Sequence, residues 1–371
     1  SINDVSHEKN RHAINREQNR LAKERLIDFL VKNQVLPGFG FPVHVVELDT
    51  KAENLELTRD KSIALFEYAP GNTVVADGYA IPSVGLKNSY FREEEQFFYR
   101  ICCQCGHAEV CANDTFKQHC PVCGVDLEAP ASYSQSPKQK MLVPAGFTSD
   151  TSRLPQKAGA TIFPSFHRRQ SFVRFKDDGA ETAHHPTGVY MTSYAGDAEL
   201  YIVNTGEPGE KGFRFCTSCR SLVPKGTRHQ RPFGGDCRNQ FFDEHIHLGH
   251  TFRTDAVRMR FDSSHIPGLP SPTDLGFWRS LSYAVLKGAV IELQIERNDL
   301  GAVVQPYNAG AAYGQEIILY DAVPGGAGYC RYFRSDERIE KIFQAALKIV
   351  AQCDCDPDSS CHRCLRSYDN A

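Results

Sequence analysis

Apolar residues recur at helical spacing in three segments of this chain. Between residues 10 and 33, leucine, isoleucine and valine recur among Lys, Arg and Glu, which predicts a helix that ends before a Pro-Gly breaker. A second helix is expected over about 274–288, with Ser271 or Thr273 as its N-cap. The last helix is expected to begin near Ser335, because an apolar stripe follows it at helical spacing.

Short apolar runs separated by turn residues predict strands between these helices. Residues 161–203 alternate between apolar and polar positions, which favours further strands. Residues 129–160 are rich in Pro, Ser, Lys and Gly and are expected to form a linker or long loop. The individual runs predicted to be strands are 41–48, 64–68, 73–76, 257–261, 290–295 and 316–321.

The predicted elements and the cysteine clusters together indicate an α+β fold. We expect zinc-ribbon insertions on a mixed sheet core, followed by a C-terminal α/β segment that a four-cysteine zinc knuckle closes. The expected divisions are an N-terminal helix and strand region at 1–97, a zinc ribbon at 98–128, a β-rich region with a second Cys/His cluster at 129–250, and the α/β segment with the last zinc site at 251–371.

Composition adds three constraints on the class of protein. The 371 residues carry a formal net charge of −3, so any contact with DNA must come from local basic patches. The longest apolar run is too short to span a bilayer, and the first residues lack the basic and apolar regions of a signal peptide. The chain has 14 cysteines in tight pairs, which favours zinc binding in a reducing, cytoplasmic setting over disulfides.

The first cysteine cluster has the spacing of a zinc ribbon. Cys102 and Cys105 form one Cys-x-x-Cys pair, Cys120 and Cys123 form another, and a glycine follows each pair. Two such pairs supply the four thiolates of a tetrahedral zinc site. Cys103 is an alternative to Cys102, but only Cys102 gives the regular spacing.

The second cluster lacks an obvious fourth ligand. Cys216, Cys219 and Cys237 supply three thiolates, and His229 is the first choice to complete the shell. Three other histidines are rivals for that place, and a core role for Cys237 without any metal is the alternative. The rival histidines are His245, His247 and His250.

The third cluster places Cys353, Cys355, Cys361 and Cys364 within twelve residues, which predicts a third zinc site. Four-thiolate shells leave no open position, so these sites are expected to be structural. We therefore expect about two to three zinc ions per chain. A disulfide knot is the alternative and would need an oxidising compartment.

Catalytic motifs are sparse. The sequence contains no Gly-x4-Gly-Lys-[Ser/Thr] phosphate loop, so the chain itself carries no motor motif of that type. The Gly-Gly-Ala-Gly run at 325–328 is read as a tight turn, because it is an incomplete dinucleotide-binding pattern. Carboxylates near strand ends permit a metal-dependent nuclease as an alternative, but no Glu-x-Lys pair accompanies them, so solvated strand ends are the favoured explanation. These acids are Glu292, Glu296, Asp299 and Asp321.

Basic residues lie beside aromatic residues in two places. His167, Arg168 and Arg169 precede Phe172 and Phe175, a mixture that single-strand grooves use. Two arginines and a tyrosine lie on the third knuckle, where a fixed guanidinium can meet a phosphate. An ordinary solvated face is the alternative for both places. The candidate DNA-contacting residues are Arg168, Arg169, Arg363, Arg366 and Tyr368.

Two C-terminal segments carry a specific pattern. Residues 319–329 read Leu-Tyr-Asp-x2-Pro-Gly-Gly-Ala-Gly-Tyr, and residues 353–370 read Cys-x-Cys-x5-Cys-x2-Cys-Leu-Arg-Ser-Tyr-x-Asn. Together they resemble the zinc-binding domain of unknown function that ends MrfA-type DNA helicases and occurs in Druantia helicases and in DrmB, the helicase-associated subunit of the DISARM phage-defence system. Residues 36–42, 67–71 and 248–255 resemble further blocks of that family, so the resemblance covers nearly the whole chain.

The resemblance implies a role with a superfamily-two helicase in DNA repair or antiphage defence. It also implies that Cys353, Cys355, Cys361 and Cys364 bind the metal, and it transfers no catalytic residue. A degenerate phospholipase-D-like fold is one expectation for the α/β segment, although its His-x-Lys-x4-Asp motif is absent.

We therefore expect a zinc-binding, DNA-binding scaffold module whose helicase motor is supplied in cis or in trans, and no membrane association. One alternative is a nuclease that uses Asp321 with Glu292 or Glu296. A second alternative is a protein–protein adaptor without DNA contact.

Overall fold

The computed structural model describes residues 45–50, 55–87, 95–128, 136–150, 156–159, 167–175, 180–310, 312–356 and 359–367. The helix predicted over 10–33 lies outside these residues, as does the start of the strand predicted from residue 41. The resemblance at 36–42 also lies outside them.

The described elements follow one another in a mixed α and β order, which confirms the α+β class. They are β1 (Val45–Asp49), β2 (Leu57–Asp60), α3 (Lys61–Glu67), β3 (Thr73–Ala76), β4 (Tyr79–Leu86), β5 (Gln96–Ile101), β6 (Ala108–Cys111), β7 (Lys138–Leu142), β8 (Phe147–Ser149), β9 (Gln156–Lys157), β10 (Arg169–Arg174), β11 (Glu181–His184), β12 (Tyr190–Asn204), β13 (Phe213–Cys216), β14 (His229–Gln230), β15 (Asp236–Cys237), β16 (Phe242–Phe261), α4 (Leu275–Leu293), the 3-10 helix η1 (Arg297–Asp299), β17 (Leu300–Asn308), β18 (Tyr313–Asp321), the 3-10 helix η2 (Tyr329–Arg334) and α5 (Asp336–Ala351).

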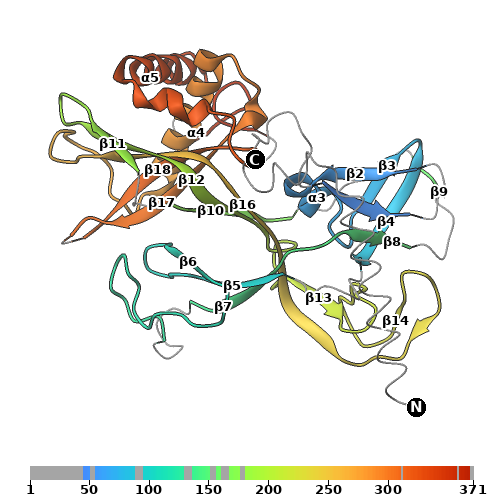
Figure 1. Ribbon diagram of the computed structural model, residues 1–371. Coiled ribbons are helices and arrows are strands. Elements are labelled where there is room, and N and C mark those ends of the chain that lie inside the picture. The colour runs from blue at the N-terminus through green and yellow to red at the C-terminus, as the bar shows by residue number, and fades with distance from the viewer. Residues whose placement is uncertain are drawn as a thin grey trace.

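The long strand β16 is the axis of the larger sheet. It pairs antiparallel with β12, β13 and β18 and parallel with β7, and β7 in turn pairs with β5. Within the described ranges this sheet has ten strands, and a separate sheet of six runs β2-β1-β8-β4-β3 with β9 beside β4. Figure 1 shows β16 curving from the side of α4 and α5 down to the region of β13 and β14.

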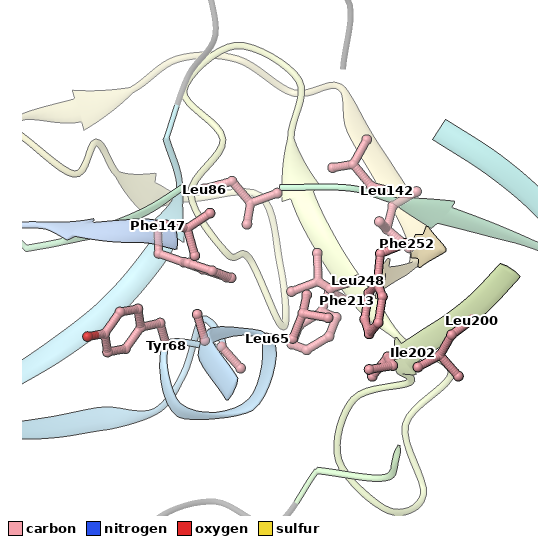
Figure 2. Packing of buried hydrophobic residues seen from close by; sticks show 14 of the residues in the cluster. Leu65, Tyr68, Leu86, Leu142, Phe147, Leu200, Ile202, Phe213, Leu248 and Phe252 are labelled. Carbon is pink, nitrogen blue, oxygen red and sulfur yellow. The ribbon is translucent and has the colours of Figure 1, made fainter. Parts of the chain in front are cut away.

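Side chains of the ten-stranded sheet alternate between two apolar cores, as the pleat of a strand requires. On β16, Phe252 and Ala256 join the core shared with the six-stranded sheet, whereas Val257 and Met259 face α4 and α5. Figure 2 shows Leu65 of α3 among side chains of the larger sheet, so the two sheets share one apolar layer. This layer fixes α3 and the small sheet against the middle of β16 and β12.

The prediction of a strand at 64–68 was wrong, because these residues lie in and just after the short helix α3. Asp60 caps that helix, since its carboxylate accepts a hydrogen bond from the Ser62 amide at 2.8 Å. One turn of helix buries Ala64 and Leu65 together, which an apolar run read as a strand does not reveal. The predicted strands at 73–76, 257–261 and 316–321 are confirmed within β3, β16 and β18.

The prediction of a strand at 290–295 was also wrong. Helix α4 continues to Leu293 and ends at Gln294, which adopts the left-handed conformation with a φ of 54°. Its N-cap is Asp274 in place of Ser271 or Thr273, because the Asp274 carboxylate accepts from the Phe277 amide at 3.1 Å.

The segment expected to be a linker contributes strands instead. Strands β7 and β8 lie within 129–160, and β7 pairs with both β5 and β16. The other expected segment boundaries stay predictions, although β16 runs continuously through residue 250. No helix in the described part of the chain is long and apolar enough to cross a bilayer.

Helices α4 and α5 approach each other at Gly288. A Cβ built there would lie 2.4 Å from the Ile342 carbonyl oxygen and 3.1 Å from the Ala346 side chain. Such a contact is too short for any side chain to accept without movement of the backbone.

We therefore expect Gly288→Ala to lower the melting temperature, with a loss of about 1–3 kcal/mol from overpacking. The gain in helix propensity, about 1 kcal/mol, should not offset this loss. Gly276→Ala in the same helix is the matched control, because its Cβ would meet only the Asp274 carboxylate at 3.5 Å. Thermal unfolding of both variants with zinc bound tests this; equal melting temperatures would contradict it.

Candidate metal centres

Three groups of side chains in the described part of the chain bring four possible metal ligands together. Within each group the candidate ligand atoms all lie within 4.8 Å of one another. The groups are Cys102, Cys105, Cys120 and Cys123; Cys216, Cys219, His229 and Cys237; and Cys353, Cys355, Cys361 and Cys364.

The first group is held by two turns of the same geometry. In one turn the Cys102 amide donates to the His107 carbonyl at 2.8 Å, and Gly106 has a φ of 82°. In the other turn the Cys120 amide donates to the Val125 carbonyl at 2.9 Å, and Gly124 has a φ of 75°. Only glycine adopts this conformation without strain, so the glycine after each pair shapes the knuckle.

The sulfur separations in this group suit a tetrahedral metal site. The Sγ atoms of Cys102 and Cys123 are 3.6 Å apart, and those of Cys105 and Cys120 are 3.7 Å apart. Zn–S bonds of about 2.3 Å in a tetrahedron place sulfurs about 3.8 Å apart. A disulfide would bring them to about 2 Å. This chemistry and geometry fit zinc.

The second group includes His229. The Cys216 and Cys237 sulfurs are 3.9 Å apart, and the His229 Nε2 lies 3.3 Å from the Cys219 Sγ. The other ring nitrogen of His229 lies 3.0 Å from the Thr227 carbonyl, the kind of contact that fixes the ring of a metal ligand.

The rival histidines are placed elsewhere. His247 Nδ1 lies 2.5 Å from the Tyr99 hydroxyl, and the His250 ring packs beside Phe252. His245 is exposed and lies outside the group.

Arg220 occupies the position that glycine holds in the first group. Its φ is 59°, its amide donates to the Cys216 carbonyl, and the Cys216 amide donates to the Ser221 carbonyl, both at 3.0 Å. The buried Arg220 guanidinium lies 2.7 Å from the Asp243 carboxylate. The sequence lacks the glycine that marks the turns of the first group, and only the spacing of Cys216 and Cys219 predicted this pair.

Hydrogen bonds to its sulfur favour the thiolate form of Cys216 in the second group, whereas burial raises the pKa of Cys219 to about 11. Burial by itself raises the pKa of the Cys216 thiol, but the Cys219 amide and the Asn239 side chain oppose that effect and lower the pKa to about 6. Asn239 Nδ2 lies 3.2 Å from the Cys216 sulfur. Since metals bind the deprotonated thiolate, these donors prepare the site for zinc.

The third group is a four-cysteine zinc-binding cluster that follows α5. Its sulfurs are close, with Cys353 3.3 Å from Cys355 and 3.6 Å from Cys361. The amides of Cys364 and Arg363 lower the pKa of the Cys361 thiol to about 6, because they stabilise its thiolate.

Lys287 of α4 fastens this third cluster to the helices. Its Nζ donates to the carbonyl oxygens of His362 at 3.1 Å, Arg363 at 2.8 Å and Cys364. An ammonium has three donors, and all three are used on one turn. Neither residue spacing nor charge pattern signals this contact in the sequence, because 75 residues separate Lys287 from His362.

The structure places the basic candidates in different surroundings. Arg363 and Arg366 are exposed on the third cluster, while Tyr368 lies outside the described residues. Arg168 donates to the Glu210 carbonyl at 3.1 Å, and Arg169 lies over the Phe66 ring.

The aromatic partners expected beside Arg168 and Arg169 are not available for stacking on bases. Phe172 is buried and stacks on Tyr201, with the ring centroids 5.6 Å apart. The Cζ atom of Arg258 lies 4.6 Å from the centroid of the Phe175 ring. The expectation of an aromatic groove at 167–175 was therefore wrong, because the strand alternation of β10 turns Phe172 into the core.

The acids of the nuclease alternative have structural partners. The buried Asp321 carboxylate accepts from the amides of Ala327, Gly328, Tyr329 and Cys330 at 2.7–3.1 Å, which closes the Gly-Gly-Ala-Gly run into a tight turn.

Glu296 and Asp299 cap the 3-10 helix η1 through their side chains. Glu292 lies exposed on α4. These contacts do not gather the acids into a metal group within the described residues.

The MrfA Zn-binding domain family matches residues 281–365, a range that includes Lys287 and the third cluster. Residues 281–365 thus match an MrfA-type zinc-binding domain. This confirms the resemblance expected from the C-terminal cysteine pattern, and it makes zinc the metal that this chain binds.

A longer curated protein is similar to nearly the whole chain. The Druantia protein DruE of Escherichia coli (strain UMEA 4076-1) is 23% identical over 414 residues, which cover 95% of this chain and 21% of DruE. The chain thus spans about a fifth of the length of that curated relative.

Two solved structures of the DUF1998 helicase MrfA are also similar. The DNA-bound structure has 12% identity and a TM-score of 0.38, covering 88% of this chain and 32% of that chain. The structure with DNA and AMPPNP has 11% identity and a TM-score of 0.29, covering 88% and 30%.

We expect His229→Ala to weaken the second zinc site, because three thiolates would remain without the imidazole. One zinc ion per chain should then pass to a competing chelator at concentrations that leave the parent protein loaded. Native mass spectrometry would count the ions. His245→Asn is the control, since asparagine tolerates the φ of 56° at that position. A full zinc complement in His229→Ala, or a loss in His245→Asn, would show that the ligand is misassigned.

Lys287→Met should loosen the third cluster within the MrfA-type domain. The substitution removes three hydrogen bonds, two of them exposed to solvent, so we expect a loss of about 1–2 kcal/mol. Amides of residues 361–366 should exchange faster and the cluster should release zinc faster. Lys341→Met is the control, because the Lys341 ammonium lies in an exposed ion pair with Glu337, away from the third cluster. Identical zinc-release rates in both variants would refute the role of Lys287.

Proposed function

We propose that this chain is a zinc-stabilised DNA-binding module that acts with a superfamily-two helicase in DNA repair or antiphage defence. The observation that carries the proposal is the third cluster, where Lys287 fixes a turn that presents Arg363 and Arg366 to solvent. The match to the MrfA Zn-binding domain supports the association with a helicase.

The exposed arginines suit contact with a phosphate backbone. Neither guanidinium has a carboxylate partner within the described residues. Arginine binds phosphate oxygens through paired N–H donors, and a rigid turn reduces the entropy lost on binding. The turn is tied by the Arg366 amide to the Cys361 carbonyl at 3.0 Å, by the zinc ligands and by Lys287. Arg168 and Arg169, exposed at the start of β10, are proposed as a second phosphate contact.

The proposed ligand set is the twelve side chains of the three groups, with one zinc ion in each. Closed shells of four protein ligands act structurally, so the ions shape loops and take no part in a reaction. The motor would be supplied in cis or in trans, and the cytoplasm is the proposed compartment. DISARM and Druantia systems are the proposed defence contexts, the latter supported by the similarity to DruE.

The nuclease alternative is not favoured. The Asp321 carboxylate already accepts four backbone N–H groups, which leaves it poorly placed to bind Mg²⁺. The adaptor alternative differs from the proposal in one measurable property, the absence of DNA affinity.

We expect Arg363→Ala combined with Arg366→Ala to weaken binding to duplex and single-stranded DNA of any sequence. Loss of two phosphate contacts should flatten the slope of log affinity against log salt by about 1.8 for duplex DNA. Fluorescence anisotropy at several salt concentrations measures this. Lys348→Ala on α5 is the control, since it removes one exposed charge away from the turn. Equal affinities for parent and double variant would refute the phosphate role, and a parent without affinity would favour the adaptor.

A further inference from the structure

The second zinc group carries an exposed surface that the proposed function does not use. We call it the knuckle-two face. It comprises the β14–β15 hairpin with its flanking residues and the residue before β16. Its members are Lys225, Arg228, Arg231, Phe233, Arg238 and Phe241, all exposed.

The cations of the knuckle-two face are not neutralised by neighbours. Arg214 and Arg220 nearby are paired, with Glu244 and Asp243 respectively. The four cations of the face have no carboxylate within ion-pair distance among the described residues. Asp236 is the one acidic residue between 225 and 241. In a chain of net charge −3, this is a local concentration of positive charge.

Two phenylalanines on this face are exposed yet held by ordered backbone. Phe241 is 76% exposed, and its carbonyl accepts from the Thr217 amide, the Thr217 hydroxyl and the Asn239 side chain at 2.8–3.1 Å. Phe233 is 60% exposed at the tip of the hairpin, which the Arg231 amide closes onto the Gly235 carbonyl at 2.9 Å. Both rings are therefore held at defined places on the exposed surface.

The zinc ligands fix the positions of Arg228 and Arg238. His229 pairs with Cys237 across the hairpin, and both belong to the second metal group. Arg228 and Arg238 are the next residues outward on the two arms. Because neighbouring residues of a strand point to opposite faces, these arginines turn away from the metal and towards solvent.

We propose that the knuckle-two face binds single-stranded nucleic acid. Phe233 and Phe241 stack on bases, and Arg228, Arg231 and Arg238 contact the phosphates between them. Every base has a face for stacking, so the mode is tolerant of sequence. A duplex keeps its bases stacked on each other and offers no such faces to the two rings. An apolar protein partner fits less well, because the same short segment carries four cations and one acidic residue.

This inference rests on the proposed function. It names single-stranded DNA as the form that the knuckle-two face would bind. The third cluster would hold the backbone of either form, whereas the knuckle-two face would select the unpaired strand that a helicase produces. The two surfaces are therefore separable by mutation.

The aromatic part is tested by Phe233→Ala combined with Phe241→Ala in the zinc-loaded full chain, with anisotropy of a labelled oligothymidylate of about twenty nucleotides. We expect binding at least tenfold weaker, with duplex affinity nearly unchanged. The matched control is Ile63→Ala combined with Leu347→Ala, since these side chains are 48% and 69% exposed on other elements. Zinc content by mass spectrometry shows whether the fold is kept.

Phe241→Trp offers a direct readout of stacking. The chain has one tryptophan, Trp278, which is buried. An indole at position 241 should keep the parent affinity, and oligothymidylate should quench its fluorescence while the parent emission stays unchanged. Absence of quenching despite tight binding would overturn the stacking role.

The charged part is tested by replacing Arg228, Arg231 and Arg238 with Gln. For single-stranded DNA, the slope of log affinity against log salt should flatten by about 0.7 for each lost phosphate contact, about 2 in total.

The outcomes separate this inference from the proposed function. If the parent binds no DNA, the proposed function fails. If the parent binds DNA and the Arg363 and Arg366 variant is weakened, but the phenylalanine variant binds oligothymidylate like the parent, only the knuckle-two inference fails. If, among the variants of this face, only the one that lacks Arg228, Arg231 and Arg238 is weakened, the face is a general anion-binding surface. If the face binds an acidic polypeptide as well as it binds DNA, it is a protein surface. Either result overturns the inference.

Discussion

Backbone pairing along β16 is the constraint on which the rest of the structure depends. The strand runs from Phe242 to Phe261 and pairs first with β13, then with β7, and finally with β18. β13 ends at Cys216 of the second metal group, and β5, the partner of β7, leads to Cys102 of the first. A slip of one residue would turn every side chain of a strand to the other face. The register of β16 therefore determines where the first two metal groups lie and which side chains of the sheet face α4 and α5.

The metal groups stand where apolar cores end. The clusters around them contain few apolar side chains apart from the cysteines themselves. Ordering the backbone costs about 1–2 kcal/mol per residue, and so little apolar burial cannot offset that cost over such loops. Zinc binding supplies the missing free energy, since apparent values for structural zinc reach about 10–16 kcal/mol. The first metal group is also held by the β17–β18 hairpin. Tyr313 packs on its cysteines, and the Asn308 side chain donates to the Pro121 carbonyl at 3.3 Å.

The sequence was most informative where a local pattern reflects a local physical need. Regular cysteine spacing pointed to the three groups, and the apolar stripe of α5 predicted that helix from Ser335. It failed where a short apolar run fits two structures, as at 64–68 and 290–295, because a few residues carry too little periodicity to separate helix from strand. Contacts between distant residues were also invisible, among them Lys287 with the third cluster. Phe172 looked available beside two arginines, yet strand alternation buried it.

Arg220 shows how the Cys216–Cys219 turn of the second group differs from the two glycine turns of the first group. A left-handed residue other than glycine costs roughly 1–2 kcal/mol, so an arginine there needs compensation. Its guanidinium, 7% exposed, meets Asp243 on β16, and its carbonyl accepts from the Leu86 amide of β4 at 3.1 Å. Glycine would satisfy the backbone but could not reach Asp243. The residue thus joins the metal turn to both sheets at once, and the strain of one backbone conformation is offset by contacts that no local sequence rule requires. This turn is for that reason harder to recognise in the sequence than the two glycine turns of the first group, and it is tied to both sheets.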